Sequence, residues 1–112
     1  MVYILLGAGF ETAEALVAAN ILRRGGVAVK LAGIGGPTVA SSHNIVVTAD
    51  CPVESVTLSA GDMVVLPGGM GGVSSIAACP AAMALAEQAA KSDELWLAAI
   101  CAAPAMLAEA GV

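Results

Sequence analysis

The sequence predicts an α/β domain in which a parallel β-sheet is sandwiched between helices. Hydrophobic residues make up 59% of the 112 residues but aromatic residues only 3%, so the apolar content comes mainly from Ala, Val, Leu and Ile. This composition favours buried parallel strands and closely packed helices. Short apolar runs also alternate along the chain with segments of helical periodicity, as they do in βαβ units. We therefore expect residues 1–112 to form a single domain.

The first βαβ unit is predicted over residues 2–32. The apolar run Val2–Leu6 predicts a strand, and a glycine-containing turn separates it from a helical pattern. That pattern places four apolar residues on one side of the helix: Leu16, Val17, Ile21 and Leu22. Arg23 and Arg24 complement the helix dipole, and Gly25 and Gly26 end the helix before the next strand, Val27–Ala32.

A small hairpin and a third core strand are expected next. After a turn at Gly33–Pro37, Thr38–Ala40 is predicted to pair with Ile45–Thr48 around residues 41–44. Met63–Leu66 is a continuous apolar run, which is typical of a buried parallel strand. It ends in Pro67–Gly72, whose glycines permit close backbone contacts.

The remaining sequence predicts a helix, a fourth core strand and the start of another helix. Pro80 is suited to a first helical turn, and the helical pattern continues to near Lys91. Leu95–Ile100 is the fourth strand, and Cys101 falls where this strand stops. Ala102–Ala110 then resumes a helical pattern.

Several candidate functional residues follow the carboxyl ends of predicted strands. A parallel sheet in a flavodoxin-like order gathers these ends at one edge, where such sheets bind ligands. Glu11, Glu14, Gly69 and Cys101 all lie directly after a strand or within one turn of the following helix. We therefore expect these four residues to converge on one rim.

Composition and charge exclude several classes of function. The longest apolar run, Leu95–Ala108, is shorter than the roughly 20 residues of a membrane span, and no secretory signal pattern is present, so a cytoplasmic protein is expected. With a net charge of −5 and only four basic residues, neither nucleic-acid nor membrane binding is expected. Gly7-Ala8-Gly9 fails as a dinucleotide fingerprint, because Thr12 occupies the third glycine position and no acid ends the second strand.

Three cysteines without CxxC spacing predict neither a disulfide framework nor a zinc site, and we expect no metal and no cofactor. Cys101 has two interpretations. On a strand-to-helix turn it is placed as an exposed nucleophile, with the Gly69 and Ala102 N–H groups as an oxyanion hole and an acid after the first strand as proton carrier. A buried core cysteine is the alternative. Cys51 and Cys79 are expected to be structural thiols.

Four ordered motifs resemble the ThiJ/PfpI family of the class I glutamine amidotransferase-like superfamily. They are GFETAEA at residues 9–15, LRRGG at 22–26, VVLPGG at 64–69 and AAICAAP at 98–104. The resemblance implies that Cys101 is an easily oxidised nucleophile, that Glu14 is a protonated acid bonded to it, and that Gly69 and Ala102 supply oxyanion N–H groups. As an alternative, Glu14 and Glu11 are simply acids favoured at a helix start.

The resemblance carries further implications and two departures. His43 is implied to approach the pocket, although a surface role is the alternative, and Arg24 to lie near a two-fold dimer interface. Peptidase-like members carry His where this chain has Ala102, so peptidase activity is disfavoured. The family's second acid is replaced by Thr12. A family domain is also longer, so we expect its C-terminal strands and helices to be missing here and supplied by a complementary C-terminal fragment, with the whole domain a homodimer.

The leading functional expectation is a cysteine-dependent enzyme of glyoxalase or deglycase type that acts on a small aldehyde without a cofactor. A redox-sensing stress protein or chaperone is the alternative, because an exposed, activated thiol serves it equally well. Some family members carry names that refer to thiazole monophosphate biosynthesis, but no phosphate-binding loop is present to support that role.

Overall fold

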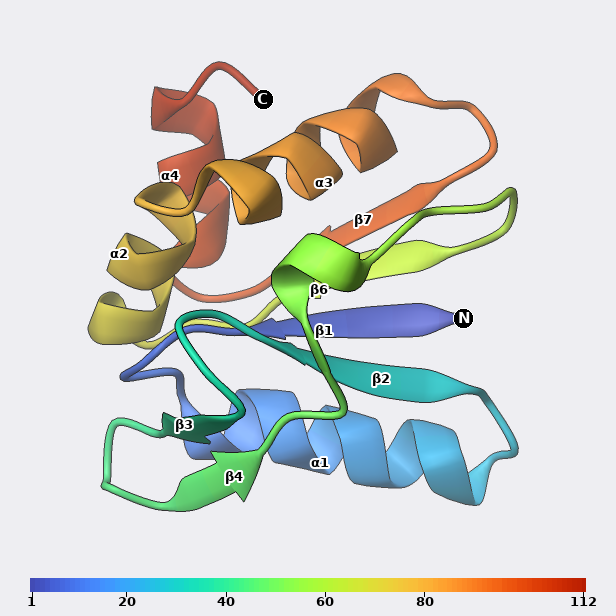
Figure 1. Cartoon of the computed structure of the whole chain (residues 1–112). Coiled ribbons are helices and arrows are strands. Elements are labelled where there is room, and N and C mark those ends of the chain that lie inside the picture. The colour runs from blue at the N-terminus through green and yellow to red at the C-terminus, as the bar shows by residue number, and fades with distance from the viewer.

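A computed structural model describes all residues from 1 to 112 and has three layers, with a parallel sheet between two layers of helices (Figure 1). The strand order is β5-β2-β1-β6-β7, and every neighbouring pair is parallel. The strands are β1 (Val2–Leu6), β2 (Val29–Gly33), β5 (Cys51–Pro52), β6 (Met63–Leu66) and β7 (Trp96–Ala99). The predicted α/β fold with a parallel sheet is confirmed.

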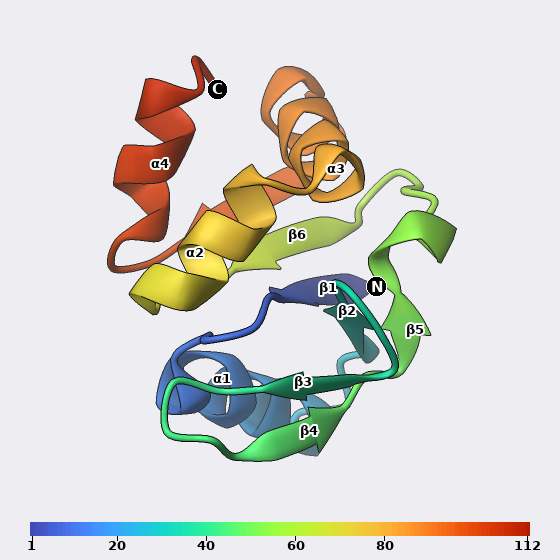
Figure 2. The same ribbon diagram turned by 60° about the vertical axis from the view of Figure 1, so that its left-hand side comes forward.

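Helices cover both faces of this sheet (Figure 2). On one face lies α1 (Thr12–Arg24), with the antiparallel hairpin of β3 (Thr38–Ala40) and β4 (Val46–Thr48) beside it. On the other face lie α2 (Met70–Ala77), α3 (Pro80–Lys91) and α4 (Ala103–Glu109), and one 3₁₀ turn spans Val53–Ser55. The antiparallel pairing of β3 with β4 confirms the predicted hairpin. No single helix is long and apolar enough to cross a bilayer, and only α2 and α3 counted together across an 88° bend reach that length.

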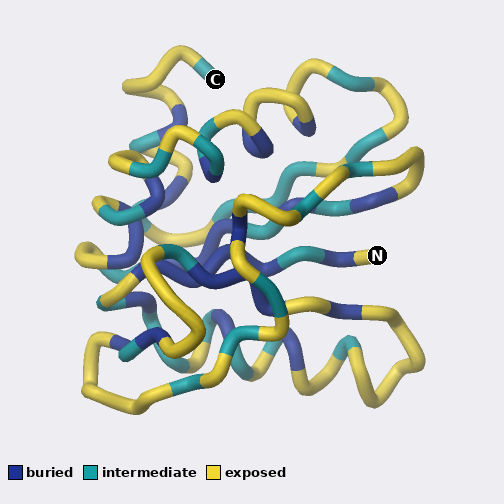
Figure 3. The backbone as a smooth tube through the Cα atoms, viewed as in Figure 1, coloured by how far each residue is buried: buried dark blue, intermediate teal, exposed yellow.

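The buried residues form one cluster on each face of the sheet, as the dark segments of the backbone show in Figure 3. Alternate residues of β1 divide between the clusters, because successive side chains of a strand point to opposite faces. Leu5 packs with α2, α3 and α4, whereas Ile4 and Leu6 pack with α1. The central strand is therefore anchored from both sides.

The packing face of α1 differs from the predicted one. Ala15 and Ala19 are fully or almost fully buried, while Val17 and Ile21 are 52% and 60% exposed. Small side chains let a helix approach a sheet closely, and here alanines take the contact positions in place of larger residues. The prediction that Val17 and Ile21 share a packing side with Leu16 and Leu22 is wrong for the first two, since only the last two pack against the core.

Three elements were not predicted: α2, β5 and the 3₁₀ turn at Val53–Ser55. The sequence suggested only a glycine-rich strand end at Pro67–Gly72, but a helix begins at Met70 and carries two glycines in its first turn. Glycine is a poor helix former, so local helix propensity does not predict this helix. Its glycines are needed for packing, because a Cβ added at Gly72 would lie 2.7 Å from the Phe10 Cα.

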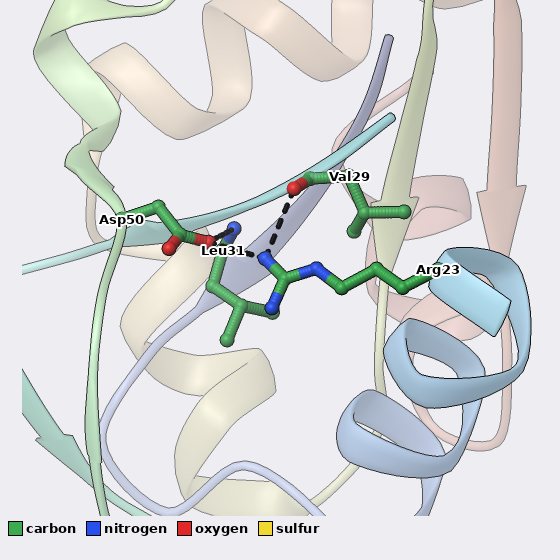
Figure 4. A network of polar contacts seen from close by, with 4 residues as sticks. All are labelled: Arg23, Val29, Leu31 and Asp50. Atoms are coloured by element: carbon green, nitrogen blue, oxygen red, sulfur yellow. Dashed lines mark hydrogen bonds and ion pairs between the residues drawn. The ribbon is translucent and has the colours of Figure 1, made fainter. Parts of the chain in front are cut away.

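A polar network joins the end of α1 to the edge of the sheet (Figure 4). Arg23 Nη2 donates to the Val29 carbonyl at 3.0 Å and to Asp50 Oδ2 at 2.7 Å. The same Asp50 oxygen accepts the Leu31 N–H at 2.7 Å. β5 pairs with β2 only from Ala32 onward. Asp50 therefore satisfies a β2 donor just before the neighbouring strand begins.

Replacing Asp50 with alanine is expected to lower the free energy of unfolding by about 1–3 kcal/mol, because the half-buried Leu31 N–H loses a charged acceptor. Arg23→Ala is expected to cost less, about 1 kcal/mol or below, since both ends of that ion pair are 40% or more exposed. Chemical denaturation of the two variants measures the order. A larger loss for Arg23→Ala than for Asp50→Ala would contradict this account of the network.

One end of the sheet is open. β7 pairs only with β6, and Trp96 at its start and Ile100 directly after its end are 64% and 50% exposed. Trp96 lies in register with Met63, which packs toward the α1 face of the sheet. Helix α1 covers β1 and β2, so an apolar strip along β7 is left facing outward.

Candidate functional site

Cys101 lies in the tight turn between β7 and α4 and is exposed. Its φ angle is 61°, a left-handed conformation that non-glycine residues adopt rarely and mostly where the surrounding structure imposes it. The turn is held by the Ile100 N–H, which donates to the Leu66 carbonyl, and by the Ala103 N–H, which donates to the Ile100 carbonyl. The thiol thus sits on a strained strand-to-helix elbow at the carboxyl edge of the sheet.

Glu14 reaches the same place from the first turn of α1. Its Oε1 accepts the Gly68 N–H at 2.8 Å, and its side chain is half-buried. A Cβ added at the buried Gly68 would overlap Glu14 Oε1 and lie 2.7 Å from Cys101 Cβ and 3.4 Å from Cys101 Sγ. Glu14 and Cys101 therefore lie against the same peptide, with no room between them for a side chain on Gly68.

Gly68 is a site residue that the sequence reasoning missed. The predicted partner of Cys101 on this loop was Gly69, but the peptide that touches both Glu14 and Cys101 belongs to its neighbour. A signal for it existed, because two glycines follow a buried strand. A half-buried carboxyl group also needs a hydrogen-bond partner, and here the Gly68 backbone N–H provides it.

Gly69 joins the loop before α1 to the start of α2. Its φ is 90°, and a Cβ there would lie 2.5 Å from the Gly9 carbonyl oxygen and 2.6 Å from the Glu11 N atom. The Glu11 N–H also donates to the Gly68 carbonyl at 2.9 Å. The loop before α1 and the loop before α2, which are far apart in the sequence, are therefore held in close contact.

The Gly69 and Ala102 N–H groups, predicted as oxyanion donors, have no acceptor within the protein. Gly69 lies in the loop that contacts Cys101, and Ala102 directly follows Cys101 in the sequence. Unpaired N–H groups near a nucleophile can stabilise negative charge that develops on a substrate oxygen. The arrangement suits addition of a thiolate to a carbonyl group.

The two secondary candidates lie outside this contact set. His43 is exposed in the β3–β4 loop, and its Nδ1 lies 3.2 Å from Ser42 Oγ. That loop borders the site, because the Ser42 N–H donates to the Phe10 carbonyl just before α1. Arg24 is in the last turn of α1, about 15 Å along the helix axis from Glu14. The structure therefore does not bring Arg24 to Cys101.

Cys51 and Cys79 are half-buried, in β5 and before α3, and neither lies in the elbow loop. The structure gathers no group of three or more His, Cys, Asp or Glu side chains that could hold a metal ion. The candidate site therefore consists of one thiol, one carboxyl group and backbone N–H groups.

Comparisons with known proteins point to one family. The model of the DJ-1/PfpI family matches residues 1–112. Protein dj-1beta of Drosophila melanogaster is 37% identical over 110 residues, which are 97% of this chain and 58% of that protein. The glutathione-independent glyoxalase DJR-1.2 of Caenorhabditis elegans is 32% identical over 102 residues, which are 91% of this chain and 54% of that protein. The chain thus spans little more than half the length of these relatives.

Solved structures agree with this. The crystal structure of Drosophila melanogaster DJ-1beta matches with a TM-score of 0.86 at 34% identity, over 99% of this chain and 60% of that one. Oxidized Toxoplasma gondii DJ-1 matches with a TM-score of 0.85 at 30% identity, over 98% and 60%. The sheet and helices described above are therefore shared with these proteins.

Proposed function

Because the chain belongs to the DJ-1/PfpI family, we propose that it provides the nucleophile and proton carrier of a cysteine-dependent glyoxalase or deglycase that acts on small carbonyl compounds. The observation that carries this proposal is the contact of Cys101 and Glu14 with the same Gly68 peptide. The name of the Caenorhabditis elegans relative, a glutathione-independent glyoxalase, supports it.

For methylglyoxal the proposed reaction begins with a bond between Cys101 Sγ and the aldehyde carbon. The aldehyde oxygen becomes negatively charged and is stabilised by the Gly69 and Ala102 N–H groups. Glu14 carries the proton of the aldehyde carbon to the neighbouring carbon through an enediol, which leaves a lactate thioester on Cys101. Water then cleaves this thioester to release lactate and the thiol, so no oxidant or cofactor is consumed.

The proposal also concerns the rest of the domain. A complementary C-terminal segment packs on the outward strip of β7, and the whole domain forms a homodimer. The exposure of Trp96 and Ile100 supports the first point, and the exposure of Val17 and Ile21 on α1, the helix that ends at Arg24, supports the second. Small aldehydes are the proposed substrates.

Conversion of methylglyoxal to lactate by the folded protein, with any complementary fragment retained, tests the function. Glu14→Gln is expected to reduce kcat/KM at least about 100-fold, because an amide cannot carry the proton but still accepts the Gly68 N–H. Glu11→Gln is the matched control, since its side chain only accepts the Ala13 N–H at the helix start, and it should stay near the wild-type rate. Equal rates for both variants would exclude Glu14 as the proton carrier.

A redox-sensing role for the same thiol is the second candidate, favoured by the exposure of Cys101 and by the oxidized state of the Toxoplasma gondii structure. Mild peroxide would then oxidise Cys101 stoichiometrically. Such oxidation in a protein that turns over no aldehyde would favour this role over the enzyme.

A further inference from the structure

An apolar groove runs between α2 and α4 and opens beside the elbow. Its volume is about 440 Å³. The two helices lie side by side, and each begins near the carboxyl edge of the sheet (Figure 2). The apolar lining comes from both helices: Met70, Val73 and Ala77 on α2, and Ala102, Ala105 and Met106 on or just before α4.

The near end of the groove is lined by residues that directly follow the proposed reaction site in the chain. Met70 directly follows Gly69, and Ala102 directly follows Cys101, so the residues at its near end adjoin both proposed oxyanion donors. From Ala102 to Glu109 the groove follows two turns of helix, or about 10 Å. A group attached to a carbonyl held at the elbow would therefore have a channel to enter.

The charges along the groove limit what enters it. No Lys, Arg or His lines it, and its one charged residue, Glu109, carries a negative charge at the far end. A phosphate or carboxylate on the substrate would find no cation here and would be repelled. Apolar surface that is removed from water, in contrast, gains free energy in proportion to its area.

We propose that this groove holds the apolar substituent of the carbonyl substrate. The substrate class is then a 2-oxoaldehyde with an alkyl or aryl side chain, held with its aldehyde carbon at Cys101 and its tail between Met70 and Met106. Methionine side chains suit such a tail, because they adapt to irregular apolar shapes. This inference rests on the proposed function, whose reacting atoms it leaves unchanged.

A chain-length comparison tests the proposal on the folded protein. We expect kcat/KM for 2-oxooctanal to exceed that for methylglyoxal about tenfold or more, since several methylene groups leave water. Ala105 is exposed and lines the groove, so Ala105→Phe fills the groove without entering the core, and it should reduce this preference about tenfold. Ala108→Phe adds the same ring to an exposed position of α4 outside the groove and should preserve the preference.

A second measurement does not depend on turnover. The rate of Cys101 alkylation by N-hexyl iodoacetamide is divided by the rate with iodoacetamide, and this ratio should fall in Ala105→Phe but not in Ala108→Phe. Methylglyoxal turnover with no chain-length preference, and ratios that are equal in all three proteins, would overturn the groove while the proposed function stands. No turnover of any aldehyde, with a ratio that still falls in Ala105→Phe, would overturn the function and keep the groove as an apolar binding site.

Discussion

Cys101→Ser is expected to reduce methylglyoxal turnover at least about 1000-fold, which corresponds to roughly 4 kcal/mol of transition-state stabilisation. A thiol is partly ionised near neutral pH and is intrinsically nucleophilic, whereas a serine hydroxyl needs a strong neighbouring base. The carboxyl group and the N–H groups around the elbow cannot replace the missing thiolate as the nucleophile. The measurement is kcat/KM for lactate formation.

The fold of the Cys101→Ser variant should survive, because serine is smaller than cysteine only by the change of sulfur to oxygen and the position is exposed. Both residues bear the same cost of a positive φ. Cys79→Ser is the matched control, a half-buried thiol between α2 and α3, and it should retain turnover. Turnover by Cys101→Ser near the wild-type rate, with an unchanged melting temperature, would exclude the proposed mechanism.

Gly69→Ala is expected to lower the free energy of unfolding by roughly 3 kcal/mol or more. A left-handed backbone at a non-glycine residue costs about 1–2 kcal/mol, and forcing a methyl group into a packed site costs about 1–3 kcal/mol. Both costs apply here, because φ is 90° and the new Cβ would meet the Gly9 carbonyl oxygen and the Glu11 N atom. The melting temperature should fall by more than about 10 °C.

Gly26→Ala separates the two costs. Gly26 has a φ of 81°, close to that of Gly69, but nothing lies within 4 Å of a Cβ built there. Only the backbone cost of about 1–2 kcal/mol should therefore appear. The difference between the two variants measures how tightly the loops before α1 and α2 are clamped together. Equal losses would mean that these loops separate easily, and that they do not position Glu14 firmly.

Much of the fold could be predicted from the sequence, because strands and helices with strong periodicity carry their own signals. The run Met63–Leu66 and the helix from Pro80 were predicted with the bounds that the structure has. What escaped prediction was decided by packing between distant segments. Met70 begins a helix despite two following glycines, because these glycines meet the loop at Phe10.

The face of α1 illustrates the same limit. Periodicity alone favours large apolar residues such as Val17 and Ile21 at the core, but the helix turns alanines to the sheet instead. The candidate site, too, could be predicted only in part. The elbow position of Cys101 follows from a strand that stops before a helical pattern, whereas the contact of Glu14 with Gly68 joins residues 54 positions apart and needs the folded chain.

The outward position of β7 gives the protein an optical reporter. Trp96 is the one tryptophan of the chain and is 64% exposed on the strand that leads into the elbow. Excitation at the red edge of protein absorption therefore selects a single indole, whose emission depends on whether the strip along β7 faces water or another surface. Collisional quenching of this fluorescence by a soluble quencher then reports whether the strand is exposed or covered. It needs no label and does not alter the thiol a few residues away.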